Sequence, residues 1–189
     1  MNSWWRAFYG RFNDKECDWL IDYALQLPAV QGQIGHGGVS STMDKSFRES
    51  TLRWLKRDDP SLYWLYQRIE TLALTANAEA FGFDIKGFYE IQFTEYDASN
   101  SGHYNWHEDN TWKINKPYDR KLSMVIQLSN KEDYEGGRLE LTNDPLPDNV
   151  FRNRGDVIIF PSFNKHRVTN LTKGKRYSLV TWFVGPKFK

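Results

Sequence analysis

Residues 87–96 read GFYEIQFTEY, and in this stretch the periodicity of the chain changes from helical to strand-like. Side chains two residues apart share one face of a β-strand. The alternation gives two faces, with Gln92, Thr94 and Tyr96 on one and Ile91 and Phe93 on the other. The stretch therefore predicts a strand, and it separates a helical N-terminal region of the chain from a C-terminal region rich in strands.

Strand-like segments continue to the end of the chain. KLSMVIQL at 121–128 places four large apolar side chains on one face, those of Leu122, Met124, Ile126 and Leu128. Four more short segments follow, bounded by Gly, Pro, Asn or Asp: GGRLEL at 136–141, GDVIIFP at 155–161, KHRVTN at 165–170 and KRYSLVTWFV at 175–184. Such a run of short strands is typical of a sandwich or a barrel.

Two helices are predicted in the N-terminal region. The first begins at a capping box formed by Asn13 and Glu16, and apolar residues follow it at helical spacing. Asp59 and Pro60 provide the N-cap and the first helical position of the second helix, which continues to about Gly82. Helices followed by a run of strands indicate an α+β fold.

Residues 31–50, between the predicted helices, are rich in Gly, Ser and Gln and show no sustained period. This composition predicts a long loop that is either functional or disordered. The chain shows no repeat, linker or second domain. We therefore expect a single domain over 1–189, in which the helices back a sandwich or barrel.

The composition restricts the class of partner. Lys and Arg total 25 and Asp and Glu total 24, so net charge provides no attraction to nucleic acid or to an anionic membrane. The single Cys17 excludes an internal disulfide and fits a reducing compartment. Because no signal peptide or membrane span is evident, we expect a cytoplasmic protein. Aromatic residues make up 16 % of the chain, which indicates a β-rich core or an aromatic pocket.

The stretch HYNWHEDNTW at 103–112 permits two kinds of metal site. On a helix His103 and His107 would share one face, whereas on a strand His107 and Asp109 would share one. The stretch follows a turn-rich segment and consists of mediocre helix formers, so extended chain is favoured. This excludes the helical zinc site, and a third ligand has to come from elsewhere in the chain.

The remaining histidines are His36, in a glycine-rich loop, and His166, at the start of a predicted strand. Two histidines and one carboxylate on extended backbone are typical of non-haem iron(II) oxygenases, in which the metal keeps open positions. Arg176 and Ser178 share a strand face ten and twelve residues further on. A buried arginine there could hold a carboxylate through two hydrogen bonds.

From about Gly87 to Gly185 the sequence resembles the Fe(II)/2-oxoglutarate-dependent dioxygenase superfamily, specifically its prolyl 4-hydroxylase type. Four ordered motifs carry the resemblance: HED at 107–109, YEGGRLEL at 134–141, GDVIIFPSFNKHRV at 155–168 and GKRYSLVTWF at 174–183. The resemblance implies a double-stranded β-helix (a jelly roll) over 86–186, with 1–85 as helical support and a lid loop.

The resemblance also implies roles for individual residues. It makes three residues the iron ligands: His107, Asp109 and His166. Arg176 would bind the distal carboxylate of 2-oxoglutarate, and Tyr96 would hydrogen-bond this cosubstrate. Some relatives carry a tyrosine where this chain has Gln127. Either Gln127 or Ser178 would then complete the carboxylate site.

Substrate contacts are implied for Tyr104 and Trp182 in the pocket, and for Arg48 in SFRESTLRWL at 46–55, which is similar to the Arg-x-Ser segment of the family's mobile loop. The implied reaction hydroxylates prolyl residues of a peptide or protein. It consumes 2-oxoglutarate and O2 at Fe(II) and releases succinate and CO2, with ascorbate as a reductant.

Other functions remain open at this point. The same chemistry could act on a free amino acid, another protein side chain or a nucleobase. Nucleic-acid demethylases of this fold usually carry a second arginine where this chain has Trp182, so we expect no nucleic acid and no membrane as partner. A silent jelly-roll binding module is opposed by the complete ligand set. A zinc hydrolase would need a general base beside the metal, and Glu108 lies on the opposite strand face. The oligomeric state is left open.

Overall fold

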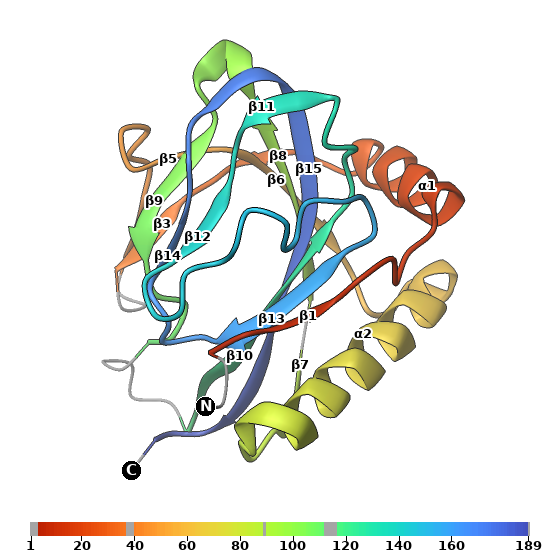
Figure 1. Cartoon of the computed structure of the whole chain (residues 1–189), viewed down its shortest axis with the longest axis vertical. Helices are drawn as coiled ribbons and strands as arrows, with labels where there is room; N and C mark the ends of the chain where they lie inside the picture. The colour runs from red at the N-terminus through yellow and green to blue at the C-terminus, as the bar shows by residue number, and fades with distance from the viewer. Residues whose placement is uncertain (1–3, 37–39, 89, 112–116, 189) are drawn as a thin grey trace.

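A large antiparallel sheet runs through the middle of the molecule (Figure 1). The computed structural model describes residues 4–36, 40–88, 90–111 and 117–188. The strand order of the large sheet is β1 (Arg6–Phe8), β13 (Val157–Pro161), β10 (Tyr118–Gln127), β15 (Leu171–Pro186), β8 (Ile91–Asp97), β6 (Thr51–Leu55) and β2 (Val30–Gln31). Two short strands, β7 (Gly87–Phe88) and β11 (Tyr134–Gly136), also pair with β15.

A small antiparallel sheet completes the β-structure. Its order is β12 (Leu139–Leu141), β14 (His166–Val168), β9 (His103–His107) and β5 (Arg48–Glu49). Two further strands, β3 (Ile34–His36) and β4 (Ser40–Thr42), pair with each other in antiparallel fashion. Apolar side chains from both sheets pack into one core, among them Val125, Ile158 and Phe160 of the large sheet and Leu139 and Val168 of the small one. The two sheets therefore enclose a common interior, as in the jelly roll that the sequence predicted.

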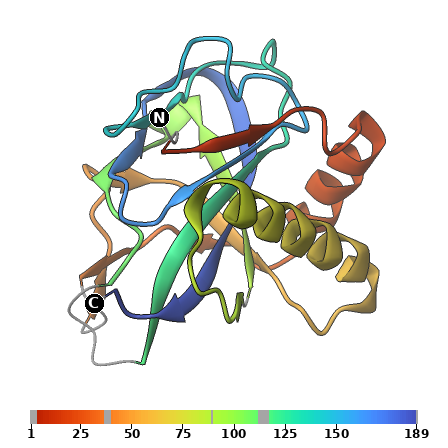
Figure 2. The same cartoon turned by 60° about the horizontal axis from the view of Figure 1, so that its bottom comes forward.

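Two helices cover the outer face of the large sheet (Figure 2). Helix α1 (Asp14–Leu25) begins at the predicted capping box, in which the side chain of Asn13 accepts from the backbone N–H of Glu16 at 3.0 Å. Helix α2 (Tyr63–Ala76) follows a 3-10 turn (Pro60–Leu62) that is capped by Asp59, and a π-helical turn (Asn77–Phe81) ends it at Gly82. Both predicted helices are confirmed.

The helices and the large sheet share a second core. The apolar stripe of α2 lies against the apolar face predicted for 121–128, and all four of those side chains are fully buried: Leu122, Met124, Ile126 and Leu128. Ile91 and Phe93 of β8 belong to this core as well, whereas Tyr96 belongs to the core between the sheets. The two faces predicted for 87–96 are therefore present in the structure, and each packs into a different core.

The N-terminal region contains more β-structure than the sequence indicated. Residues 31–50, predicted as a loop, contribute to β2, β3, β4 and β5, and β6 follows directly. The strands within 31–50 are short, so they leave no periodic pattern. β3 and β4 pair with each other, whereas β5 pairs with a strand far along the chain, Arg48 with Tyr104. The segment 1–85 therefore does more than provide helical support, because β6 lies beside β8 in the large sheet. Among the described residues, no helix has the length and apolar character needed to cross a bilayer.

Candidate active site

The predicted metal ligands meet in the small sheet, where β9 and β14 are neighbours. His107 and His166 are directly paired in the register, and the backbone N–H of Asp109 donates to the carbonyl of Ser162 at 2.9 Å. Nε2 of His107 lies 3.8 Å from Oδ1 of Asp109, and Nε2 of His166 lies 3.4 Å from Oδ2. One ligand atom from each residue can be chosen so that all lie within 4.8 Å of one another. The extended backbone predicted for 103–107 is confirmed.

Hydrogen bonds orient both imidazole rings. Nδ1 of His107 lies 2.7 Å from the carbonyl oxygen of Asn105, and Nδ1 of His166 lies 2.9 Å from that of Asn164. A carbonyl can only accept, so each Nδ1 carries the proton and each Nε2 keeps its lone pair. Two imidazole lone pairs and one carboxylate then point at a common position, which is the donor set of a facial triad and fits iron(II).

The protonation states suit metal binding. Burial, reinforced by the neighbouring His166, lowers the pKa of His107 to about 3, so its ring is neutral at pH 7. Burial alone would raise the pKa of Asp109, but the electrostatic effects of the two histidines and Arg120 outweigh it and lower this pKa to about 2. A neutral imidazole and an ionised carboxylate are the forms that bind a divalent metal.

Ser123 supports the carboxylate from β10. Its hydroxyl donates to Oδ2 of Asp109 at 2.7 Å, and it lies 2.9 Å from the hydroxyl of Ser162. Both serines are completely buried. The sequence analysis overlooked Ser123, although it alternates with the apolar residues of KLSMVIQL and so had to point to the opposite face, toward the interior between the sheets.

Arg176 of β15 is buried, with 2 % of its surface exposed. Its Nε donates to Oε1 of Gln127 at 3.0 Å, and no carboxylate among the described residues pairs with it. Gln127 in turn donates from Nε2 to the hydroxyl of Tyr134 at 3.0 Å. A buried guanidinium without an anion is energetically unfavourable, so this position is suited to a carboxylate ligand.

The other predicted cosubstrate residues lie nearby. Tyr96 pairs with Arg176 in the sheet register, and its ring centre lies 5.8 Å from the guanidinium carbon. Burial raises the pKa of Tyr96, which keeps its hydroxyl protonated and able to donate. Ser178 is buried and pairs with Gln127 across β15 and β10. Of Gln127 and Ser178, Gln127 is the one that hydrogen-bonds to Arg176.

Tyr104 and Arg48 form one wall beside the metal ligands. The ring of Tyr104 stacks on His107 with centroids 3.5 Å apart, and the guanidinium of Arg48 lies 4.3 Å from the Tyr104 ring centre. Arg48, which the resemblance places on the lid loop, lies in the short strand β5. Its side chain is buried because β5 pairs with β9, and its Nε donates to the hydroxyl of Ser50 at 2.9 Å.

Trp182 stacks on Arg120, another residue that the sequence analysis overlooked. The guanidinium carbon of Arg120 lies 3.8 Å from the Trp182 ring centre, and its Nη1 is 3.4 Å from the carbonyl oxygen of Asp109. Burial lowers the pKa of Arg120. The indole Nε1 of Trp182 is buried without a hydrogen-bond partner. This wall therefore holds an unused donor close to the metal ligands.

His103 lies outside the cluster. The ring of His103 contacts the carbonyl oxygens of Ser101 at 2.8 Å and Ser46 at 3.1 Å. The side chain of His36 is not among those that the structure describes, and its backbone lies in β3. Of the two candidates for the third ligand, the structure therefore brings His166 to the site.

A jelly roll that holds two histidines and one aspartate in this way defines the class of non-haem iron(II) oxygenases. Residues 91–184 match the family model described as "2OG-Fe(II) oxygenase superfamily". A PKHD-type hydroxylase of Colwellia psychrerythraea is 33 % identical over 171 residues, which cover 84 % of this chain and 72 % of that protein. The chain belongs to the 2OG-Fe(II) oxygenase superfamily, and the sequence-based assignment is confirmed.

A second relative, a PKHD-type hydroxylase of Psychrobacter sp., is 29 % identical over 154 residues. The match covers 77 % of this chain but only 55 % of that protein, so the chain corresponds to about half the length of this relative. Members of the superfamily use iron(II), 2-oxoglutarate and O2, and these are the cofactors that the sequence predicted.

Solved structures show the same fold. A prolyl-4-hydroxylase of Pseudomonas putida superimposes with a TM-score of 0.74 at 18 % identity, covering 96 % of this chain and 92 % of that one. A prolyl hydroxylase of Trichoplax adhaerens, in complex with a peptide fragment of the hypoxia inducible factor oxygen degradation domain, gives 0.70 at 18 % identity, covering 96 % and 83 %. The α+β jelly roll with supporting helices is confirmed.

Proposed function

We propose that this chain is an Fe(II)/2-oxoglutarate-dependent dioxygenase that hydroxylates prolyl residues of a peptide or protein. The observation that carries the proposal is the buried, unpaired guanidinium of Arg176 in a jelly roll that also gathers His107, Asp109 and His166. A metal site alone would fit several activities, whereas a metal site with a separate carboxylate anchor fits a dicarboxylate cosubstrate.

Each residue of the site has a role in this reaction. His107, Asp109 and His166 would hold iron(II) on one side and leave positions open for reactants. Iron(II), when bound, supplies the redox chemistry that couples conversion of 2-oxoglutarate and O2 into succinate and CO2 to hydroxylation of the substrate. Arg176 would bind the distal carboxylate of 2-oxoglutarate, while Gln127 fixes the plane of its guanidinium.

The substrate would bind against the two walls described above, one formed by Tyr104 and Arg48 and the other by Arg120 and Trp182. Their aromatic faces would exclude water from the reacting atoms, and their buried donors can bind a carbonyl oxygen. The unpartnered Nε1 of Trp182 supports an amide-containing substrate, because a peptide carbonyl would satisfy it. Proline as the target is supported by the names of the structural neighbours, and another protein side chain or a free amino acid is the alternative.

The test is release of succinate in the presence of Fe(II), 2-oxoglutarate and O2, with and without a library of proline-containing peptides. Wild-type protein should release succinate in a peptide-stimulated way, and mass spectrometry should find one added oxygen atom on proline. His166→Ala should abolish both signals, and Lys131→Ala, an exposed change away from the site, should alter neither. If succinate is released but peptides do not stimulate its release, the oxygenase assignment stands and the prolyl-peptide substrate is excluded.

A further inference from the structure

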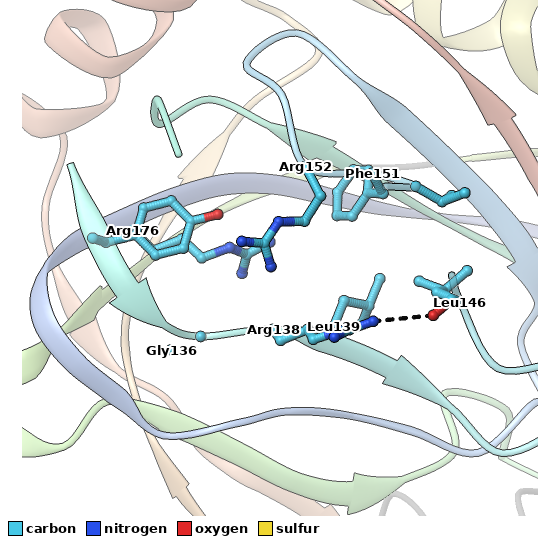
Figure 3. Close-up of a pocket in the computed structure, with 10 residues that line it drawn as sticks. Gly136, Arg138, Leu139, Leu146, Phe151, Arg152 and Arg176 are labelled. Carbon is cyan, nitrogen blue, oxygen red and sulfur yellow. Dashed lines mark hydrogen bonds between the residues drawn. The ribbon is translucent and has the colours of Figure 1, made fainter. Parts of the chain in front are cut away.

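A pocket lies beside Arg176 and opens between the β11–β12 connection and the loop that precedes β13 (Figure 3). Gly136 and Gly137 form part of its wall, and a Cβ atom added at Gly137 would stand 3.2 Å from Cδ of Arg176. The same Cβ atom would stand 2.4 Å from Cδ1 of Leu171, and Gly137 has a φ of +57°, so a side chain at this position would be strained. The pocket gives the guanidinium of Arg176, although buried, an approach from outside the sheets.

Three arginines line this pocket, but their charges differ in how they are compensated. Arg138 forms an ion pair with Asp148 and donates from Nη2 to the carbonyl oxygen of Leu146 at 3.1 Å. Among the described residues no carboxylate pairs with Arg152 or with Arg176. Arg152 is exposed and lines the same pocket as Arg176 (Figure 3).

Two uncompensated positive charges that share a pocket repel each other. An anion bound between them would be attracted to both and would offset this repulsion. A guanidinium binds a carboxylate through two parallel hydrogen bonds, and one carboxylate has acceptor sites enough for two guanidinium groups. The pocket is therefore arranged for a carboxylate that is held by Arg176 from within and by Arg152 from the open side.

We propose that Arg152 is a second binding residue for the distal carboxylate of the cosubstrate, and that it makes the site selective for a dicarboxylate. This inference rests on the proposed function, because it assigns the carboxylate at Arg176 to 2-oxoglutarate. It also explains how the site can bind a carboxylate with Gln127 in place of a second hydroxyl donor, because the additional donor comes from the loop that precedes β13.

The test measures binding and does not depend on turnover. Isothermal titration calorimetry would follow 2-oxoglutarate with the Mn(II)-loaded protein, and glutarate, which lacks the keto acid, with metal-free protein. Arg152→Ala should raise the Kd of both ligands by about tenfold or more, since a hydrogen bond to a charged group is lost. Arg152→Lys should restore part of the affinity, because it keeps the charge but not the planar fork.

Arg138→Ala is the matched control, because it removes a charge from the same pocket whose guanidinium is already engaged by Asp148. Its Kd for both ligands should stay within about twofold of the wild-type value. Equal affinities for wild type, Arg152→Ala and Arg138→Ala would overturn the role of Arg152 and leave the proposed function intact. If wild-type protein bound no 2-oxoglutarate with Mn(II), both the proposed function and this inference would be overturned.

Discussion

At the metal site every ligand side chain is held by a second group. The imidazoles of His107 and His166 each have Nδ1 against the carbonyl oxygen two residues earlier in the chain, which is a contact that a strand backbone provides locally. Asp109 is different, because its support comes from Ser123 on another strand. The carboxylate is therefore the ligand whose orientation depends most on the tertiary fold.

Ser123→Ala should weaken metal binding without unfolding the protein. The change removes the hydroxyl that donates to Oδ2 of Asp109 at 2.7 Å, so the carboxylate loses its orientation. Loss of such an outer hydrogen bond typically reduces metal affinity by about 10–100-fold. Ser162→Ala, one hydrogen bond further away, should have a smaller effect. Both affinities can be measured by titration with Mn(II), and an unchanged affinity of Ser123→Ala would show that the serine is dispensable.

The proposed ligand residues could be singled out in the sequence because their signal is local. An extended backbone is enough to place His107 and Asp109 on one face, and His166 stands at the start of a predicted strand. Arg120 gave no comparable signal, and Arg48 was named only through the resemblance, because the place of each side chain depends on strand register. Arg48 pairs with Tyr104 in the small sheet, and this contact between distant segments buries a side chain that looks like part of a loop.

At the scale of the elements, a charge network ties three neighbouring strands of the large sheet together. Glu95 of β8 accepts from Arg53 of β6 at 2.9 Å and from Lys175 of β15 at 2.8 Å. Burial alone would raise the pKa of Glu95, but these two cations outweigh it and hold the pKa below its ordinary value of 4.5. The folded protein therefore favours the ionised carboxylate.

Glu95→Gln should destabilise the protein at pH 7 by about 1 kcal/mol and have little effect in acid. A carboxyl group whose pKa is lowered on folding stabilises above its unfolded pKa, and this contribution is lost as the pH falls through the folded value. The difference from wild type in urea unfolding should thus shrink below about pH 4.5. Glu135→Gln, in the exposed pair with Lys173, is the control and should change little at either pH. A pH-independent difference would refute the electrostatic origin.

Gly155 connects the N-terminal segment to the start of β13. Its φ is +80°, and an added Cβ would stand 1.9 Å from the carbonyl oxygen of Phe12, an approach that only movement of the backbone could relieve. Gly155→Ala should therefore destabilise the protein by roughly 3 kcal/mol or more. Gly10→Ala also has a positive φ, +59°, but meets nothing within 4 Å, so it should cost only about 1 kcal/mol. Equal midpoints in urea unfolding would contradict this steric argument.

Local patterns explain which elements were predictable. The capping box at Asn13 and the Asp59-Pro60 start define both helices within a few residues of sequence. The strands of 31–50 are two or three residues long, which is too short for an alternating pattern. β2 and β5 form because strands outside the segment, β6 and β9, offer edges to pair with. Their sequence is compatible with a loop and with a strand, and only the completed sheet decides between them.

At the scale of the whole molecule, the proposed ligands bridge the two sheets. His107 and His166 lie on the small sheet, whereas Arg176 lies at the centre of the large one, on β15. The helices pack on the other face of the large sheet and do not contribute to the predicted ligand set. Metal and 2-oxoglutarate would therefore add a connection between two layers that already share a core and the hydrogen bond from Ser123 to Asp109.

Mn(II) and 2-oxoglutarate together should stabilise the entire chain against heat. Ligands that bind only the folded state at about 100 times their Kd add about 2.7 kcal/mol, which corresponds to a rise in Tm of about 5–10 °C for a chain of this size. Mn(II) alone should give a smaller rise, because it engages the small sheet only. Differential scanning calorimetry would measure the shifts under nitrogen. His166→Ala should remove the response to both ligands, and Arg176→Ala should keep the response to Mn(II) but lose the increment from 2-oxoglutarate. An increment that survives in Arg176→Ala would show that 2-oxoglutarate is held by the metal alone and that the two sheets are not linked through it.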